Sequence, residues 1–196
     1  MSSGNVYERL FKLFGNIAKL VMDGKRVPEK VADVFQTIID EKVSTVKSPT
    51  ILRPIQSDLI IPATDGLRTL VQATDIFPGG VYGESCNVAG NPKPETPVVV
   101  HELIKNGTFC QMFEGQGVDL DKLGLTQDQI IQFVITHREH LHPKGYATFF
   151  LLPGSLVAYI FWYDARRLKV YVFRLALDDV WLAASRPRVV LPQLTL

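Results

Sequence analysis

Three of the four histidines lie close together in the sequence, at His137, His140 and His142. Imidazole nitrogen atoms bind transition metals, and His137 and His140 are spaced so that they would share one face of a helix. A closed metal site needs a third and a fourth ligand, and none occurs at a typical spacing. The alternative is that the three side chains meet the last carbonyl groups of a helix. They are therefore weak metal candidates, and no cofactor is expected.

A nucleophilic thiol is the second chemistry that these residues suggest. Cys86 and Cys110 are the only cysteines, and Cys110 would need a base such as His101 or His137. Cys110 falls in a segment expected to be a strand, where cysteine is commonly a small buried apolar side chain. No serine-nucleophile motif, P-loop or dinucleotide-binding glycine pattern occurs. We therefore predict no catalytic residue, although a Cys/His-dependent enzyme stays one alternative.

A segment near the C-terminal end alternates cationic and aromatic side chains. Alternate residues of a strand share one face, so the segment would present rings and cations together, as RNA-binding sheets do. The preceding strand contributes further rings at Tyr159, Phe161 and Tyr163. The candidate nucleic-acid-binding residues are Arg167, Lys169, Tyr171, Phe173 and Arg174. The competing interpretation is that the rings are core beneath the helices and that the cations form its rim.

Composition indicates an ordinary globular protein. The 196 residues are 46% hydrophobic and 21% charged, with a formal net charge of +1 that creates no general attraction for nucleic acid or a membrane surface. Two cysteines and the absence of a signal-like start favour a reducing, cytoplasmic location. Residues 147–163 carry no charge, but Pro153-Gly154-Ser155 interrupts them. We therefore expect a β-hairpin there and no membrane contact.

The elements that would position these residues fall into three regions. Residues 1–43 are expected to be a helical hairpin, with helices over 6–22 and 28–42. Residues 44–97 are expected to be a linker and an irregular loop region, with a short helix at 64–73.

Residues 98–196 should form the α+β core of one compact domain. The Asn106-Gly107 pair favours a tight hairpin between strands at 98–104 and 108–113, although a helix is the competing interpretation of the second segment. Thr126 and Gln129 form a capping box at the start of a helix that ends before Pro143. The remaining strands are expected at 147–152, 156–163, 167–175, 180–184 and 188–191. The predicted fold class is α+β: an N-terminal αα-hairpin plus a central helix packed on an antiparallel β-meander of four to six strands.

Between Lys105 and Leu194 the chain resembles a set of short predicted bacterial proteins that have no assigned function. The shared stretches are KNGTF at 105–109, DLDKL at 119–123, LTQ at 125–127, QII at 129–131, GYATFFL at 145–151, VW at 180–181 and VVLPQL at 189–194. The resemblance implies a cytoplasmic bacterial protein with a shared α+β core. It implies no activity, because the shared residues are turn, cap and core positions.

The segment 156–163 is apolar on both of its alternating faces, so both faces need cover. The helical hairpin or a second subunit could supply it. We therefore expect a non-enzymatic cytoplasmic binding or assembly module that acts through protein–protein contacts, as a homodimer. The alternatives are single-stranded nucleic-acid binding on the basic-aromatic sheet face and a Cys/His-dependent enzyme.

Overall fold

The computed structural model describes residues 51–143, 146–164 and 167–194, together with residues 19, 22–24 and 27. The chain divides into two compact units, Met1–Val46 and Lys47–Leu196. All elements discussed below belong to the second unit. Almost all of the helical hairpin predicted for residues 1–43 lies outside the described residues.

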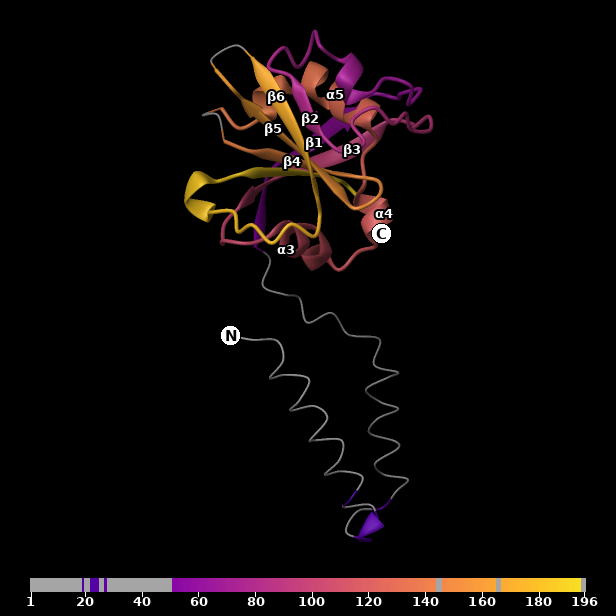
Figure 1. Cartoon of the computed structure of the whole chain (residues 1–196), viewed down its shortest axis with the longest axis vertical. Coiled ribbons are helices and arrows are strands. Elements are labelled where there is room, and N and C mark those ends of the chain that lie inside the picture. The colour runs from indigo at the N-terminus through magenta and orange to yellow at the C-terminus, as the bar shows by residue number, and fades with distance from the viewer. Residues whose placement is uncertain are drawn as a thin grey trace. The chain divides into compact units, whose positions relative to one another are not determined.

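The second unit is built on one seven-stranded sheet with the order β1-β3-β7-β4-β5-β6-β2 (Figure 1). The strands are β1 (Leu52–Ile61), β2 (Val81–Gly83), β3 (Thr96–Leu103), β4 (Thr148–Leu152), β5 (Leu156–Trp162), β6 (Leu168–Arg174) and β7 (Arg188–Pro192). Two pairs of neighbours, β4 with β7 and β2 with β6, are parallel, and the other neighbours are antiparallel. The sheet is therefore mixed.

Short helices accompany the sheet. They are α3 (Phe109–Phe113), α4 (Leu120–Leu123), α5 (Gln127–Thr136) and the 3-10 turns η1 (Leu70–Gln72), η2 (Glu114–Gln116), η3 (Arg138–His140) and η4 (Ala183–Ser185). The predicted capping box of α5 is confirmed. The Thr126 hydroxyl accepts from the Gln129 amide at 3.2 Å, and the Gln129 side-chain oxygen accepts from the Thr126 amide at 3.0 Å.

Helices cover both faces of the sheet, which gives the domain two apolar cores. On one face Ile130, Phe133 and Val134 of α5 join a buried cluster that includes Phe150 of β4. On the other face α3 and α4 join a second cluster that includes Phe149, the preceding residue of the same strand. Figure 1 shows α5 and the α3–α4 pair on opposite sides of the sheet. The described residues therefore supply much of the cover that strand β5 was expected to need.

The fold class predicted from the sequence is wrong. The sheet is seven-stranded and mixed, not an antiparallel meander of four to six strands, and its helices lie on both faces. The meander ends after β6, because the expected strand at 180–184 contributes only a single bridge from Trp181 to Gly107 and the turn η4. β7 then crosses back and inserts between β3 and β4, parallel to β4. Only long-range pairing decides that position.

The hairpin predicted at Asn106-Gly107 is also wrong, because residues 109–113 form helix α3. Thr108 and Gln111 make a second capping box: the Thr108 amide donates to the Gln111 side chain at 3.0 Å, and the Thr108 hydroxyl accepts from the Gln111 amide at 3.3 Å. Asn106-Gly107 favours a hairpin turn, whereas Thr108 and Gln111 favour the start of a helix. The helix forms because the capping box satisfies amides that would otherwise lack partners.

The stretch expected to be a linker forms edge strand β1. Its burial is concentrated at Leu52, Leu59 and Ile61, and the residues between them are exposed. Register shifts between Pro54 and Gln56 and between Gln56 and Leu59 interrupt its pairing with β3. These irregularities erase the alternation by which a strand is recognised, and they are typical of protected sheet edges. Among the helices of the described residues, none is long and apolar enough to cross a membrane.

Candidate functional site

Strands β5, β6 and β2 carry a row of aromatic rings on one face, which we call the aromatic face. Pairing places Tyr159 opposite Tyr171, and Tyr82 of β2 lies beside Tyr171 on the other side. The aromatic face consists of Tyr82, Tyr159, Phe161, Tyr163, Tyr171 and Phe173, with Lys169 among them. Residues from segments about 90 positions apart in the chain thus form one surface.

Five rings of the aromatic face, those other than Tyr163, lie beside one another with planes inclined by 7–31°. Phe161 and Tyr171 have centroids 5.9 Å apart and planes inclined by 7°, and Tyr159 and Phe161 are 4.7 Å apart at 26°. Tyr82 lies 5.4 Å from Tyr171 at 30°. Offset stacking at these distances is the favourable arrangement of aromatic pairs. The rings therefore have similar orientations, and another planar group can stack on those at the exposed end of the face.

Cations lie over these rings. The ammonium group of Lys169 is 4.7–5.1 Å from the centroids of three rings, those of Tyr82, Tyr163 and Tyr171. A side-chain hydrogen bond with Tyr171 raises the pKa of Lys169, so the group is charged at neutral pH. The Arg167 guanidinium lies 5.3 Å from the Tyr163 centroid, and its Nε donates to Asp164 at 2.5 Å. Among the described residues, Lys169 has no carboxylate partner.

Exposure increases across the aromatic face toward β2 and the β5–β6 turn. Tyr159 and Phe173 are half-buried and pack on the core beneath α3, where Tyr159 lies 5.4 Å from Trp181. Burial raises the pKa of the Tyr159 hydroxyl. Tyr82 and Tyr163 are 49% and 57% exposed. The interpretation of these rings as core beneath the helices is therefore correct only at the α3 end.

The structure separates the five predicted nucleic-acid-binding residues into two groups. Lys169, Tyr171 and Phe173 lie on the aromatic face, and Arg167 borders it. Arg174 follows Phe173 in the strand and therefore points to the opposite face. There its Nε and Nη2 atoms donate to the carboxylate oxygens of Glu84 over 2.9–3.1 Å. Tyr82 was not predicted from the sequence, because the parallel pairing of β2 with β6 leaves no local signal.

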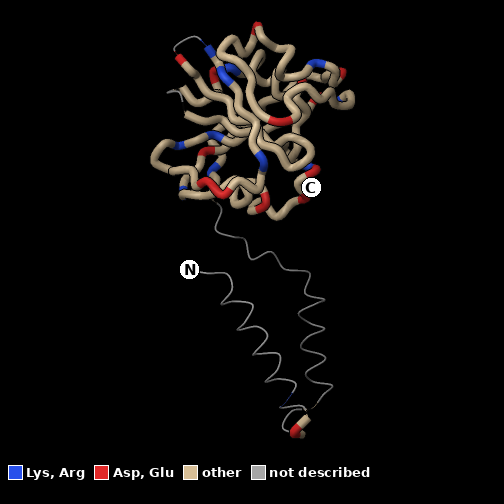
Figure 2. The backbone as a smooth tube through the Cα atoms, viewed as in Figure 1, with Lys and Arg blue, Asp and Glu red and all other residues tan. Residues whose placement is uncertain are grey.

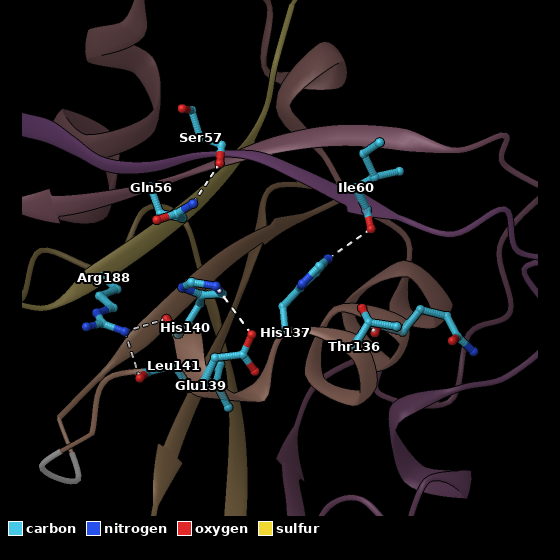
Figure 3. A network of polar contacts seen from close by, with 10 residues as sticks. Gln56, Ser57, Ile60, Thr136, His137, Glu139, His140, Leu141 and Arg188 are labelled. Atoms are coloured by element: carbon cyan, nitrogen blue, oxygen red, sulfur yellow. Dashed lines mark hydrogen bonds and ion pairs between the residues drawn. The ribbon is translucent and has the colours of Figure 1, made fainter.

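Two of the three histidines lie near each other, with 6.2 Å between the ring centroids of His137 and His140, but each makes its own polar contact. The Nε2 atom of His137 bonds to the Ile60 carbonyl at 2.9 Å, and His140 faces Glu139 at 3.4 Å (Figure 3). His142 is buried, and its ring packs on Tyr146 with 5.2 Å between centroids. In the ranges that the structure describes, no three His, Cys, Asp or Glu side chains are placed to hold a metal ion.

The carbonyl groups after α5 are met by an arginine rather than by these histidines. The Arg188 guanidinium donates to the carbonyl oxygens of His140 and Leu141 at 2.7 and 2.8 Å (Figure 3). A residue from β7 therefore supplies the interaction that the sequence assigned to the histidines.

The cysteines lack the environment of a nucleophile. Cys110 lies in α3, not in a strand, and its Sγ contacts the Leu175 carbonyl oxygen at 3.3 Å. Burial, with Glu114 and Asp178 nearby, raises the pKa of the Cys110 thiol, and burial raises that of Cys86. A raised pKa keeps a thiol protonated and unreactive.

Charge is dispersed over the described domain. Figure 2 shows lysine, arginine, aspartate and glutamate interspersed, without a large region of one sign. The net charge of the whole chain is also small, at +1, so no strong general field attracts a highly charged partner. Comparison with family models, with curated proteins and with solved structures finds no match. The resemblance to short predicted bacterial proteins therefore stays a prediction.

Proposed function

We propose that the domain formed by residues 51–194 is a non-catalytic binding domain that holds single-stranded nucleic acid on the aromatic face. The observation that carries the proposal is the array of near-parallel rings with a cation, Lys169, among them. Bases of a single strand have free faces that stack on aromatic side chains, and each stacked base contributes about 1–3 kcal/mol. Bases inside a duplex are already stacked, so a duplex is a poorer ligand for such a surface.

Each part of the aromatic face has a defined role in this proposal. Tyr171 and the exposed rings of Tyr82 and Tyr163 would stack on bases. Lys169 and Arg167 would contact phosphate groups, although Arg167 must share its charge with Asp164. About two phosphate contacts predict a slope of roughly −1.4 for log K against log salt, because each contact on a single strand contributes about −0.7. The proposed binding is therefore led by stacking and depends weakly on salt.

Fluorescence anisotropy of a labelled oligothymidylate tests this proposal. Tyr171→Leu keeps apolar volume but removes the ring, so it should weaken binding by about fivefold to a hundredfold, which corresponds to about 1–3 kcal/mol. Lys169→Gln should weaken binding and make the salt slope shallower by about 0.7. Arg174→Gln on the opposite face and Tyr146→Ala, which removes a tyrosine that packs on His142, are the matched controls. The proposal fails if wild type does not bind, or if binding survives both substitutions on the aromatic face.

The second candidate is that the aromatic face joins two copies of this chain. It is supported by the pairing of Arg167 with Asp164, which leaves Lys169 as the one unpaired charge among the described residues of the face, and by the tyrosine content typical of protein interfaces. Sedimentation of the wild type beside Phe161→Glu distinguishes this candidate: a dimer that the substitution converts to a monomer supports it, and a monomeric wild type excludes it. We also propose a cytoplasmic location, because both cysteines are free thiols.

A further inference from the structure

A groove of about 650 Å³ lies on the opposite side of the sheet from the aromatic face. One wall is formed by the loop from Glu84 to Lys93, and the other by the β4–β5 turn with Arg174 of β6. Its volume falls within the range of pockets that hold small molecules, about 300–1,000 Å³. None of its lining residues belongs to the aromatic face, so it is a separate site.

The backbone of both walls is held in place. Ser85 has a φ of 54°, a left-handed conformation that is uncommon for residues other than glycine, and its carbonyl oxygen accepts from Gln127 Nε2 at 2.6 Å. Ser155, with a φ of 57°, completes the β4–β5 turn, and its carbonyl oxygen accepts from the Leu175 amide at 2.8 Å. An unusual backbone conformation that is anchored by a buried side chain is typical of preformed binding sites.

The lining combines an apolar part with a positive charge. Leu152, Leu156 and Val88 contribute apolar surface. The charged lining residues are two cations, Lys93 and Arg174, and one carboxylate, that of Glu84. Glu84 is occupied by the forked contact from Arg174, and Lys93 has no ion-pair partner among the described residues. The groove thus offers one cation that is not compensated by a nearby carboxylate.

We propose that this groove binds a small amphipathic anion, with its carboxylate or sulfonate at Lys93 and its apolar body against Leu152, Leu156 and Val88. The balance of one surplus positive charge favours a ligand with a single negative charge. The proposal is independent of the aromatic face, because it uses other residues on the other side of the sheet.

The test uses the full 196-residue chain and two fluorescent probes with similar apolar bodies. The anionic probe is 8-anilinonaphthalene-1-sulfonate, and its uncharged counterpart is N-phenyl-1-naphthylamine. Saturable binding of the anionic probe at one site per chain is expected. Lys93→Gln should weaken the anionic probe at least about fivefold and change the uncharged probe less than about twofold, because only the sulfonate needs the ammonium group.

A second variant makes the test independent of charge. Ala89 is an exposed lining residue, so Ala89→Trp should fill the groove and weaken both probes at least about tenfold without disturbing the core. Ala184→Trp, at an exposed alanine outside the groove, and Lys122→Gln, at an exposed lysine of α4, are the controls and should leave binding unchanged. The proposal is overturned if the anionic probe does not bind, if Lys93→Gln leaves it unaffected, or if Ala89→Trp leaves either probe bound as in the wild type.

Discussion

Replacement of Gln127 by methionine should destabilise the domain more than its place on a helix suggests. Gln127 is only 7% exposed, and it joins α5 to two loops. Its side-chain oxygen accepts from the Leu70 amide at 2.9 Å, and its side-chain nitrogen donates to the Ser85 carbonyl oxygen at 2.6 Å. Methionine has a similar unbranched shape but cannot replace either hydrogen bond.

The loss in the free energy of unfolding depends on the two backbone groups that lose their hydrogen-bond partner, the Leu70 amide and the Ser85 carbonyl group. Each hydrogen bond contributes about 1 kcal/mol net, and a buried group left without a partner costs about 1–3 kcal/mol. Leu70 is completely buried, so its amide would lose its partner without gaining water. Ser85 is exposed, so its carbonyl group can turn to solvent at a smaller cost. The expected loss in the free energy of unfolding is therefore about 2–4 kcal/mol.

Urea unfolding followed by tryptophan emission measures this difference, with an unchanged m-value showing that the unfolded surface is the same. The matched control is Gln132→Met, the same change in the same helix at a partly exposed position, which should cost less than about 0.5 kcal/mol. Faster hydrogen exchange of the Leu70 amide would locate the effect. Equal stabilities for the two variants would refute the assigned role of Gln127.

Two further predictions concern the same end of α5. Thr126→Ala removes the hydroxyl that accepts from the Gln129 amide, and should lower the free energy of unfolding by about 1–2 kcal/mol in a melting experiment; a curve identical to wild type would contradict it. Burial, with Asp65 nearby, raises the pKa of Asp128, so the folded state favours the neutral carboxyl group. This contribution is present at low pH and is lost as the pH rises through the raised pKa. Asp128→Asn should therefore gain stability relative to wild type as the pH rises above the ordinary carboxyl pKa of about 4, and a constant difference would contradict this reasoning.

Local signals explain what the sequence predicted correctly. The capping box at Thr126 and the hairpin around Pro153 and Gly154 both occur as expected, because each is decided by residues a few positions apart. Strand β6 was also expected from its alternation of aromatic and aliphatic residues. Thr108 and Gln111 carried an equally local signal for α3, which the hairpin preference of Asn106-Gly107 obscured.

All of the aromatic face except Tyr82 could likewise be predicted, because alternation along β5 and β6 places Tyr159, Phe161, Tyr163, Lys169, Tyr171 and Phe173 on one side. Whether that side is core, rim or open surface could not be predicted from the sequence. It depends on α3 and Trp181 covering only one end of the face, and those segments reach it from distant parts of the chain.

The sequence by itself determined the elements that residues near one another in the chain specify: the capped helix α5, the β4–β5 hairpin and strand β6 with its alternating pattern. Only the tertiary structure decided that β7 lies between β3 and β4, that β2 brings Tyr82 to Tyr171, and that Gln127 holds Ser85 at the wall of a groove. The physical reason is that strand pairing and side-chain contacts across the sheet depend on which distant segments share a buried face. No pattern within a short window records that choice.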